Sequence, residues 1–473
     1  MKIYDTLTKR KVELVPAGEG KIGIYLCGPT VYDYGHLGHG RSAIVFDVLR
    51  RYLAYKGYSV TFVRNWTDID DKTIERASRE GVSVKELTER FIKIYEEDFK
   101  ALNILEPDVS PKPTEHIPEI IGVIERLFRN GHAYALPDGV YFDISSYGEY
   151  GKLSGQNLAE LVAGARVEVL GAKRNPGDFA LWKFEKPGEP SWESPWGKGR
   201  PGWHVECSAM SMKYLGEEFD IHCGGQDLTF PHHEDEIAQS RGAGFGFARH
   251  WMHNGFLNIN NEKMSKSLGN FFTLRDAFKT FQPMVVRFFL MSAHYRAPLN
   301  FSEESLKSAQ QALARFDDFI RRVREAENKG DRDSPSEGAG EERTTPRAHL
   351  LSLIERARTG FEEGLDDDLN ASRSLGALSD FLREANTLID RGEVTPRAAA
   401  DVIDFMRKVD SVLGVFTFEQ EILPEEIERM IEERLEARKT KDWVRADRIR
   451  KLLKGRGIVL EDTPQGTRWK RFG

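Results

Sequence analysis

The sequence lacks the features that mark membrane, secreted and disulfide-bonded proteins. No apolar run approaches the roughly 18 residues of a membrane-spanning helix, and residues 1–15 have no uninterrupted apolar core of the kind that a signal peptide requires. Three cysteines in 473 residues cannot form a closed disulfide framework. We therefore expect a cytoplasmic protein that binds no membrane, with cysteines that serve thiol or metal chemistry or fill buried positions.

Charge is distributed unevenly along the chain. The net charge is −7, yet residues 437–473 contain twelve Lys or Arg against four Asp or Glu. The length and a hydrophobic content of 40% allow roughly three domains with a large core. This pattern predicts an acidic body that carries a basic module, and only the module would bind phosphates. A charged, solvated helix remains the alternative.

Residues 22–41, IGIYLCGPTVYDYGHLGHGR, are the stretch around which the rest is organised. The apolar run at its start is typical of a buried strand, which Gly28 and Pro29 end. Apolar residues then recur at helical spacing over 43–53, and another strand-like run follows at 60–63. We predict a β-α-β unit whose first loop lies at the carboxyl edge of a parallel sheet.

Two pairs of side chains suit a polyphosphate. His36 and His39 lie at the amino end of the predicted helix, where backbone N–H groups and the helix dipole favour phosphate. Lys263 and Lys266, in the motif KMSKS, would neutralise phosphate charge during nucleotidyl transfer. Taken singly, the histidines are as typical of capping or surface positions, and the lysines of a solvated loop.

The region 202–255 predicts a metal site, because it holds six of the twelve histidines and two of the three cysteines. Within it, TFPHHEDEIA predicts a helix that begins with Thr229 as its cap. His232 and Glu236 then share one face of that helix, at the spacing by which a helix offers two ligands to one ion.

Two thiolates would complete a tetrahedral zinc shell around this pair. Cys27 and Cys207 are the candidates, which gives two thiolates, one imidazole and one carboxylate. Spacing alone leaves open His233 with Glu234, or Cys223 as a thiolate. It also leaves open surface histidines beside acids that cap the helix.

The remaining elements follow from periodicity and turn residues. A long helix is predicted from Thr73 to about Leu102, and Pro137 to Gly139 predict the turn of a β-hairpin. Helical patterns fill most of the chain from about residue 301 onward, and a strand-like run follows at 458–460. Trp443, Trp469 and Phe472 lie among basic residues, an arrangement that suits unstacked RNA bases, although a core position is the alternative for Trp443.

The expected fold class is α/β. It comprises a Rossmann-type, doubly wound parallel-sheet catalytic domain with a small inserted domain, followed by an all-α helical bundle and a small basic carboxyl-terminal domain. The predicted boundaries are 1–110 and 201–305 for the two halves of the catalytic domain, 111–200 for the insertion, 306–420 for the bundle and 421–473 for the basic domain. Residues 328–346, rich in Gly, Ser, Pro and charge, are expected to be a flexible linker.

HLGH and KMSKS together resemble the two signature motifs of the class I aminoacyl-tRNA synthetases. Along nearly its whole length the chain is similar to one family of that class, the cysteinyl-tRNA synthetases. The other stretches that carry this resemblance are NWTDIDDK, GRPGWHVECSAM, HCGGQDLTFPHHEDEIAQS and GIVLEDTPQGTRWK. Cys223 departs from the pattern, because glycine is expected there in many relatives.

The resemblance implies one Zn²⁺ per chain, bound by Cys27, Cys207, His232 and Glu236, and so selects His232 over His233. A zinc centre prefers a substrate thiolate to a hydroxyl, which would separate cysteine from serine. A site of this kind rejects the isostere without a separate hydrolytic domain.

The resemblance also assigns roles to the remaining site residues. The implied catalytic residues are His36, His39, Lys263 and Lys266. The implied nucleotide-binding residues, for ATP with Mg²⁺, are Gly28, Thr30, Gly38, Asp227 and Lys266. Thr67 and Trp203 are implied to line the amino-acid pocket.

The implied reaction activates L-cysteine with ATP and transfers it to the terminal adenosine of tRNA(Cys), in an enzyme that we expect to be a monomer. One alternative is a related ligase that joins cysteine to an amino sugar by the same adenylate chemistry, but such enzymes lack the basic module. Another is a non-catalytic RNA-binding paralogue, which would be expected to lose the signature histidines or lysines.

Overall fold

The computed structural model describes residues 1–157, 173–260, 262–263, 272–328, 346–418, 424–463 and 466–471. The chain divides into two compact units, Met1–Phe416 and Thr417–Gly473. No helix among the described residues is long and apolar enough to cross a membrane.

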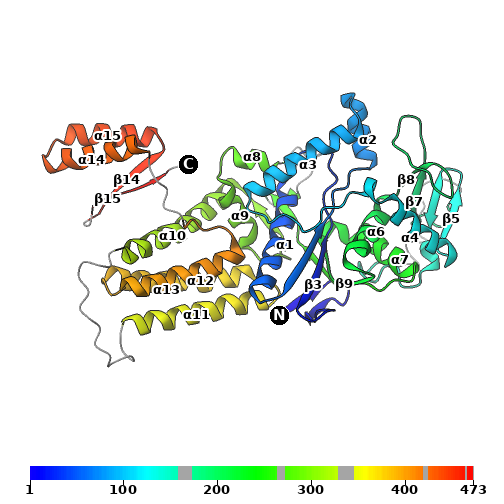
Figure 1. The fold of residues 1–473 in the computed structure, drawn as a ribbon, viewed down its shortest axis with the longest axis horizontal. Helices are drawn as coiled ribbons and strands as arrows, with labels where there is room; N and C mark the ends of the chain where they lie inside the picture. The colour runs from blue at the N-terminus through cyan, green and yellow to red at the C-terminus, as the bar shows by residue number, and fades with distance from the viewer. Residues whose placement is uncertain are drawn as a thin grey trace. The chain divides into compact units, whose positions relative to one another are not determined.

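A four-stranded parallel sheet forms the centre of the larger unit (Figure 1). Its strand order is β10-β9-β3-β4, and every neighbouring pair is parallel. The predicted β-α-β unit is therefore confirmed. The strands are β3 (Lys21–Leu26), β4 (Ser59–Arg64), β9 (Glu218–Gly225) and β10 (Phe247–Asn254).

Two helical crossovers run in opposite directions from the middle of this sheet. Helix α1 (Leu37–Tyr55) leads from β3 to β4, and α7 (Glu234–Gly242) leads from β9 to β10. Because parallel crossovers are right-handed, the two helices belong on opposite faces, and Figure 1 shows β3 and β9 between α1 and the pair α6 and α7. The topology therefore switches between β3 and β9, where ligands bind outside the carboxyl ends of the strands.

A four-stranded antiparallel sheet lies between β4 and β9 in the sequence. The predicted hairpin is confirmed, with Leu136 opposite Gly139. Helix α4 (Ile117–Arg129) and helix α6 (Trp203–Leu215) pack with this sheet in one buried apolar cluster. Ala238 of α7 belongs to the same cluster. The strands are β5 (Ala133–Leu136), β6 (Gly139–Phe142), β7 (Phe179–Phe184) and β8 (Gly199–Pro201).

The single long helix predicted from Thr73 to Leu102 is wrong. The segment forms two helices, α2 (Asp71–Glu80) and α3 (Val84–Ala101). Gly81 ends α2 with φ at +68°, a left-handed conformation that glycine adopts readily, and Ser83 begins α3 by accepting the Glu86 N–H. Hydrophobic periodicity did not reveal this break, because both helices keep an apolar face.

Helices dominate the rest of the larger unit, as predicted. Amphipathic spacing places Leu306, Leu313, Phe316, Ile320 and Val323 of α10 in the core. The main helices are α9 (Pro283–Ser292), α10 (Glu303–Glu327), α11 (Pro346–Asp366), α12 (Ala371–Asp390) and α13 (Pro396–Leu413). Most of the predicted linker, residues 329–345, lies outside the described residues.

Short elements complete the larger unit. They form an antiparallel pair at the amino terminus and a small three-stranded sheet after β10. These elements are β1 (Lys2–Asp5), β2 (Arg10–Glu13), β11 (Leu257–Ile259), β12 (Glu262–Lys263), α8 (Leu274–Phe278) and β13 (Leu299–Phe301).

The smaller unit contains two helices and a hairpin. Its core consists of Ile427, Ile449, Leu453, Ile458 and Leu460. The second strand of the hairpin was not predicted, because GTRWKR is dominated by polar residues. The elements are α14 (Glu425–Lys439), α15 (Trp443–Gly455), β14 (Ile458–Thr463) and β15 (Gly466–Arg471).

Candidate active site and metal centre

The two signature histidines form the amino-terminal cap of α1. The His39 N–H donates to His36 Nδ1 over 3.2 Å, and the His36 N–H donates to His39 Nδ1 over 3.4 Å. The two rings stack with centroids 3.5 Å apart, and the Tyr95 hydroxyl lies 3.0 Å from His39 Nδ1. Because each Nδ1 accepts a backbone N–H, each neutral ring carries its hydrogen on Nε2, as a donor for an anion.

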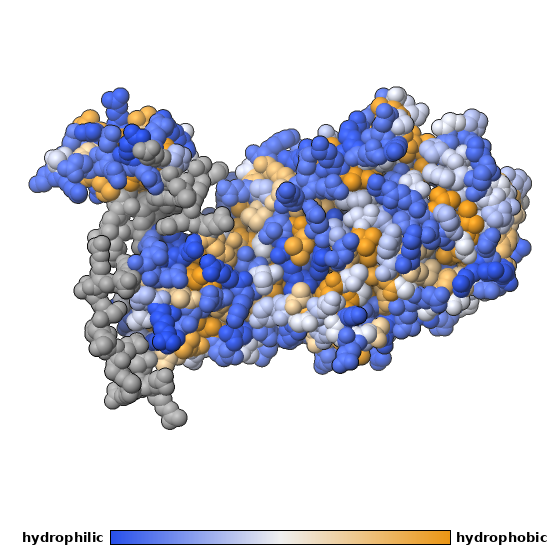
Figure 2. Space-filling model, in the orientation of Figure 1, coloured by the Kyte–Doolittle hydropathy of each residue, from blue (hydrophilic) through white to orange (hydrophobic). Residues whose placement is uncertain are grey.

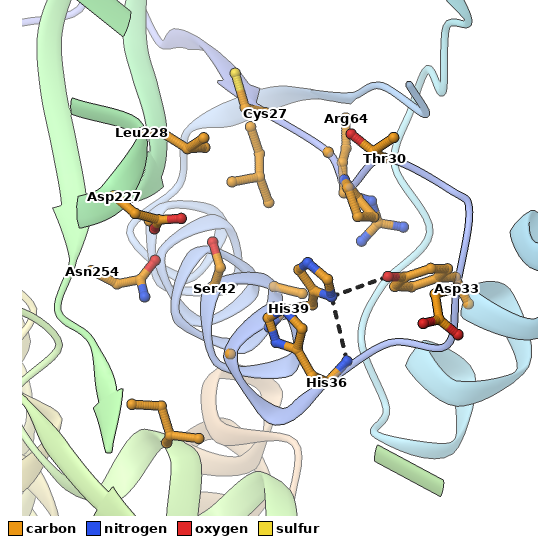
Figure 3. A pocket seen from close by; sticks show the side chains of 18 of the residues that line it. Cys27, Thr30, Asp33, His36, His39, Ser42, Arg64, Asp227, Leu228 and Asn254 are labelled. Atoms are coloured by element: carbon orange, nitrogen blue, oxygen red, sulfur yellow. Dashed lines mark hydrogen bonds between the residues drawn. The ribbon is translucent and has the colours of Figure 1, made fainter. Parts of the chain in front are cut away.

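A cavity of about 450 Å³ lies in front of these histidines, at the carboxyl ends of the strands (Figure 3). Asp227 and Asn254 lie on one side of it, and Arg64 and Asp33 on the other. Of the predicted site residues, the structure places eight at its wall: Cys27, Gly28, Thr30, His36, Gly38, His39, Trp203 and Asp227.

Gly28 allows the loop after β3 to pass close to its neighbour. A Cβ atom there would lie 1.6 Å from the Asn65 carbonyl oxygen, so no other residue fits without moving the backbone. The Gly28 N–H donates to Asn65 Oδ1 over 2.8 Å. The Asn65 side chain therefore fixes the start of the loop that carries Thr30.

Four side chains from three distant elements converge beside the cavity. One ligand atom each of Cys27, Cys207, His232 and Glu236 lies within 4.8 Å of the other three. Cys27 follows β3, Cys207 belongs to α6, and Glu236 belongs to the first turn of α7. This donor set suits a tetrahedral zinc ion. His222 and His233 form a second possible group with Cys27 and Glu236.

The electrostatics of the cluster match a cation. Burial, together with the nearby Cys207 and Glu236, raises the pKa of the Cys27 thiol well above its usual value. Burial also raises the pKa of the Glu236 carboxyl and lowers that of the His232 imidazole. Without an ion all three groups are driven toward their neutral forms, and a divalent cation would reverse this for the thiol and the carboxyl.

Hydrogen bonds orient the ligands from behind. His232 Nδ1 lies 2.8 Å from His204 Nδ1, and His204 Nε2 lies 3.2 Å from an Asp235 oxygen, whose partner oxygen accepts the Tyr150 hydroxyl. If His232 donates through Nδ1, its Nε2 is left to face Glu236, 3.1 Å away. Such outer hydrogen bonds fix the tautomer of a metal-binding histidine.

The helix that carries Glu236 begins later than predicted. Helix α7 starts at Glu234, because Phe230 has an extended conformation that interrupts the helical turn before it. Thr229 is therefore not its cap. His232 lies in the irregular turn before the helix, yet it still meets Glu236.

Of the other predicted residues, Cys207, His232 and Glu236 lie in the cluster beside the cavity, and three more remain. Thr67 is buried behind the loop, where its N–H donates to the Pro29 carbonyl over 3.2 Å and its carbonyl accepts the Val31 N–H over 3.1 Å. Lys266 lies outside the described residues. Lys263 lies in β12, but its side chain also falls outside the description.

Sequence reasoning missed several residues at the site. Three of them, Arg64, Tyr95 and Asn254, line the cavity. Another is His204, which contacts His232, and the only sequence signal that pointed to it was the clustering of histidines. Arg64 is 4% exposed, and burial lowers the pKa of its guanidinium to about 10. Its position at the last residue of β4 was readable from the sequence, but its direction was not.

Three family models match the chain. A model for the class I (C) tRNA synthetase catalytic domain covers residues 13–311. A DALR domain model covers residues 360–417, and a cysteinyl-tRNA ligase anticodon-binding domain model covers residues 421–469.

The chain is also similar to curated proteins along their whole length and to solved structures. The chain is 50% identical to a cysteine–tRNA ligase of Pelobacter propionicus over 99% of both chains, and 49% identical to that of Carboxydothermus hydrogenoformans over all of both chains. A structure of Mycobacterium tuberculosis methionyl-tRNA synthetase with methionyl-adenylate has a TM-score of 0.66 and 17% identity, covering 83% of this chain and 92% of that one. This last likeness shows the fold.

Proposed function

Because the chain belongs to the cysteinyl-tRNA synthetases, a family of class I aminoacyl-tRNA synthetases, we propose that it uses ATP to activate L-cysteine and charges tRNA(Cys). In the first step the cysteine carboxylate attacks the α-phosphate of ATP, giving cysteinyl-adenylate and pyrophosphate. In the second step the cysteinyl group passes to the terminal adenosine of the tRNA, and AMP leaves.

The observation that carries this proposal is a donor cluster with two thiols beside a cavity that holds the signature histidines, with Cys27 belonging to both. We assign Zn²⁺ to Cys27, Cys207, His232 and Glu236. When bound there, zinc would lower the pKa of the substrate thiol and favour a thiolate over the hydroxyl of serine. Trp203, whose ring stacks on His232 with centroids 4.4 Å apart, would form the adjoining wall of the amino-acid pocket.

His36 and His39 would donate their Nε2 hydrogens to the phosphates of ATP. Lys263 and Lys266 would add positive charge as pyrophosphate leaves, and Mg²⁺ would accompany the nucleotide. Gly28, Thr30, Gly38 and Asp227 are proposed nucleotide contacts, and Thr67 acts by supporting the loop after β3.

The basic carboxyl-terminal segment, 421–473, is the proposed anticodon-binding domain, and 111–200 the proposed insertion. The match to an anticodon-binding model favours tRNA as the acceptor over an amino sugar. We propose that the enzyme acts as a cytoplasmic monomer.

The test is cysteine-dependent exchange of labelled pyrophosphate into ATP, with serine as the control substrate and zinc content measured on the same sample. The proposal predicts exchange with cysteine alone, about one zinc per chain, and charging when tRNA(Cys) is added. Equal exchange with serine, or exchange without tRNA charging, would contradict it.

A further inference from the structure

The guanidinium of Arg64 presents an unusual combination of burial, charge and unmet hydrogen-bonding capacity. The residue is 4% exposed, and its Nε and Nη1 atoms have no hydrogen-bond partner among the described residues. An unpaired buried charge is costly, and arginine does not lose its proton to escape that cost. The fold therefore retains a buried cation with two unused hydrogen-bond donors.

Arg287 and Arg200, two other buried arginines, form ion pairs with carboxylates of the fold. Arg287 pairs with Asp47 over 2.6 Å and donates to three backbone carbonyls. Arg200 pairs with Asp71 and Glu189. Arg64, by contrast, forms no ion pair within 4.0 Å among the described residues, although Asp47 and Glu96 attract its charge from farther away. The faces of Trp66 and Phe99 lie 5.0 and 4.5 Å from its central carbon. These rings hold the guanidinium plane without neutralising its charge.

The position of Arg64 points to the substrate. It is the last residue of β4, paired in register with Leu26, the last residue of β3, so it stands at the carboxyl edge next to the loop that begins at Cys27. It lines the same cavity as His36 and His39, and Figure 3 shows its guanidinium turned into that cavity. The strand end and the two rings therefore place the charge at this edge before any ligand arrives.

We propose that Arg64 binds an anionic oxygen of the reacting substrates, either the carboxylate of the amino acid or the α-phosphate of the nucleotide. This inference rests on the proposed function. The two groups share one chemistry, because both accept paired hydrogen bonds from a guanidinium fork. The reacting carboxylate and phosphate must meet near the signature histidines, so a fixed cation at this edge would touch one or both. The residue thus serves as a binding residue that helps align the attack.

The first arm of the test measures affinity in the full-length, zinc-loaded protein. Arg64→Met and Arg64→Lys are compared with the parent for binding of cysteine, of cysteinol, which lacks the carboxylate, and of ATP. A loss of about 10- to 100-fold for cysteine but not for cysteinol assigns the carboxylate, and a similar loss for ATP assigns the phosphate. Arg64→Lys should fall between parent and Arg64→Met. Unchanged affinity for both cysteine and ATP overturns the proposal.

The second arm measures thermal unfolding without substrates. A guanidinium that waits for a substrate anion destabilises the empty protein, so Arg64→Met should melt at the same temperature as the parent or higher. Arg287→Met is the matched control, and it should melt lower with unchanged substrate affinities. A melting temperature of Arg64→Met well below the parent would mean that Arg64 serves the fold, and would overturn the proposal. Parent enzyme without cysteine-dependent exchange would instead contradict the proposed function.

Discussion

The candidate metal cluster of the larger unit and the basic helix of the smaller unit are built in opposite ways. Cys27, Cys207 and Glu236 come from elements up to 209 residues apart and meet in the interior. In α15, exposed side chains come from one continuous stretch, with Trp443 57%, Val444 84% and Leu452 50% exposed. Figure 2 shows hydrophobic residues among hydrophilic ones on the drawn face of the smaller unit.

This difference separates two kinds of recognition. A buried cluster with fixed geometry can discriminate a sulfur from an oxygen, because only the correct atom makes the contact for which the site is built. An exposed basic helix attracts a polyanion through charge and flat apolar contacts, and each of its residues contributes little. Substitution of one ligand in the cluster should therefore lower the rate of cysteine activation strongly. Substitution of one residue in the basic unit should weaken tRNA binding only slightly, and several substitutions would be needed for a large loss.

The largest effect is expected for Cys27→Ala, because this thiol belongs to both possible ligand groups. Zinc content should fall to near zero, and cysteine-dependent exchange should fall by about a thousandfold or more, since a metal supplies several kcal/mol. Metal analysis and exchange assays check this. Cys223→Ala is the matched control and should keep its zinc, because Cys223 donates to the Tyr25 carbonyl outside the cluster. Full metal content in Cys27→Ala would contradict the assignment of Cys27 as a ligand of the buried cluster.

Lys266→Ala should lower exchange by about a hundred- to a thousandfold, the cost of removing one charge that stabilises a transition state. Zinc content should not change, which separates the phosphate chemistry from the metal cluster. Lys279→Ala, an exposed lysine paired with Asp276, is the control that should leave exchange unchanged. Equal activity of Lys266→Ala and the parent would remove this lysine from the mechanism.

Removal of residues 421–473 should spare exchange and lower the kcat/KM of tRNA charging by about 10- to 100-fold, because several phosphate and base contacts are lost together. Parallel exchange and aminoacylation assays provide the measurement. Charging at full efficiency by the shortened chain would show that the basic unit does not contribute to tRNA recognition.

The smallest effect concerns pH. Burial, with Cys207 and Glu236 nearby, raises the pKa of the Cys27 thiol, so the metal-free protein carries this proton at neutral pH. Zinc must displace it, and the affinity for zinc should rise about tenfold per pH unit for each proton released between pH 6 and 8. Competition with a chelator at several pH values measures the slope. A slope of zero would mean that the thiol is already ionised without metal.

The sequence predicted those features that depend on local pattern. Alternating and periodic apolar residues located the strands β3 and β4, the helix α1 and the helices from α10 onward, because burial of one face is encoded locally. The break at Gly81 was missed because amphipathic periodicity continues across it. The start of α7 was misplaced, because Thr229 was predicted as its cap, whereas Phe230 is extended and the helix begins at Glu234.

The site was predictable in its chemistry and less so in its directions. Ligand types and the i, i+4 spacing of His232 and Glu236 suggested a zinc shell, but spacing could not decide between His232 and His233, and both lie close to Glu236. The sequence did not identify Arg64 as a site residue, because an arginine at the end of a strand occurs as readily on the surface as in a site. Only the fold turns its guanidinium toward the cavity.

The most direct test of the account is X-ray absorption at the zinc edge, recorded with and without substrate. Zinc should have two sulfur neighbours, from Cys27 and Cys207, and should gain a third when cysteine is added but not when serine is added. An unchanged sulfur count with saturating cysteine would contradict the claim that this cluster recognises the substrate thiol.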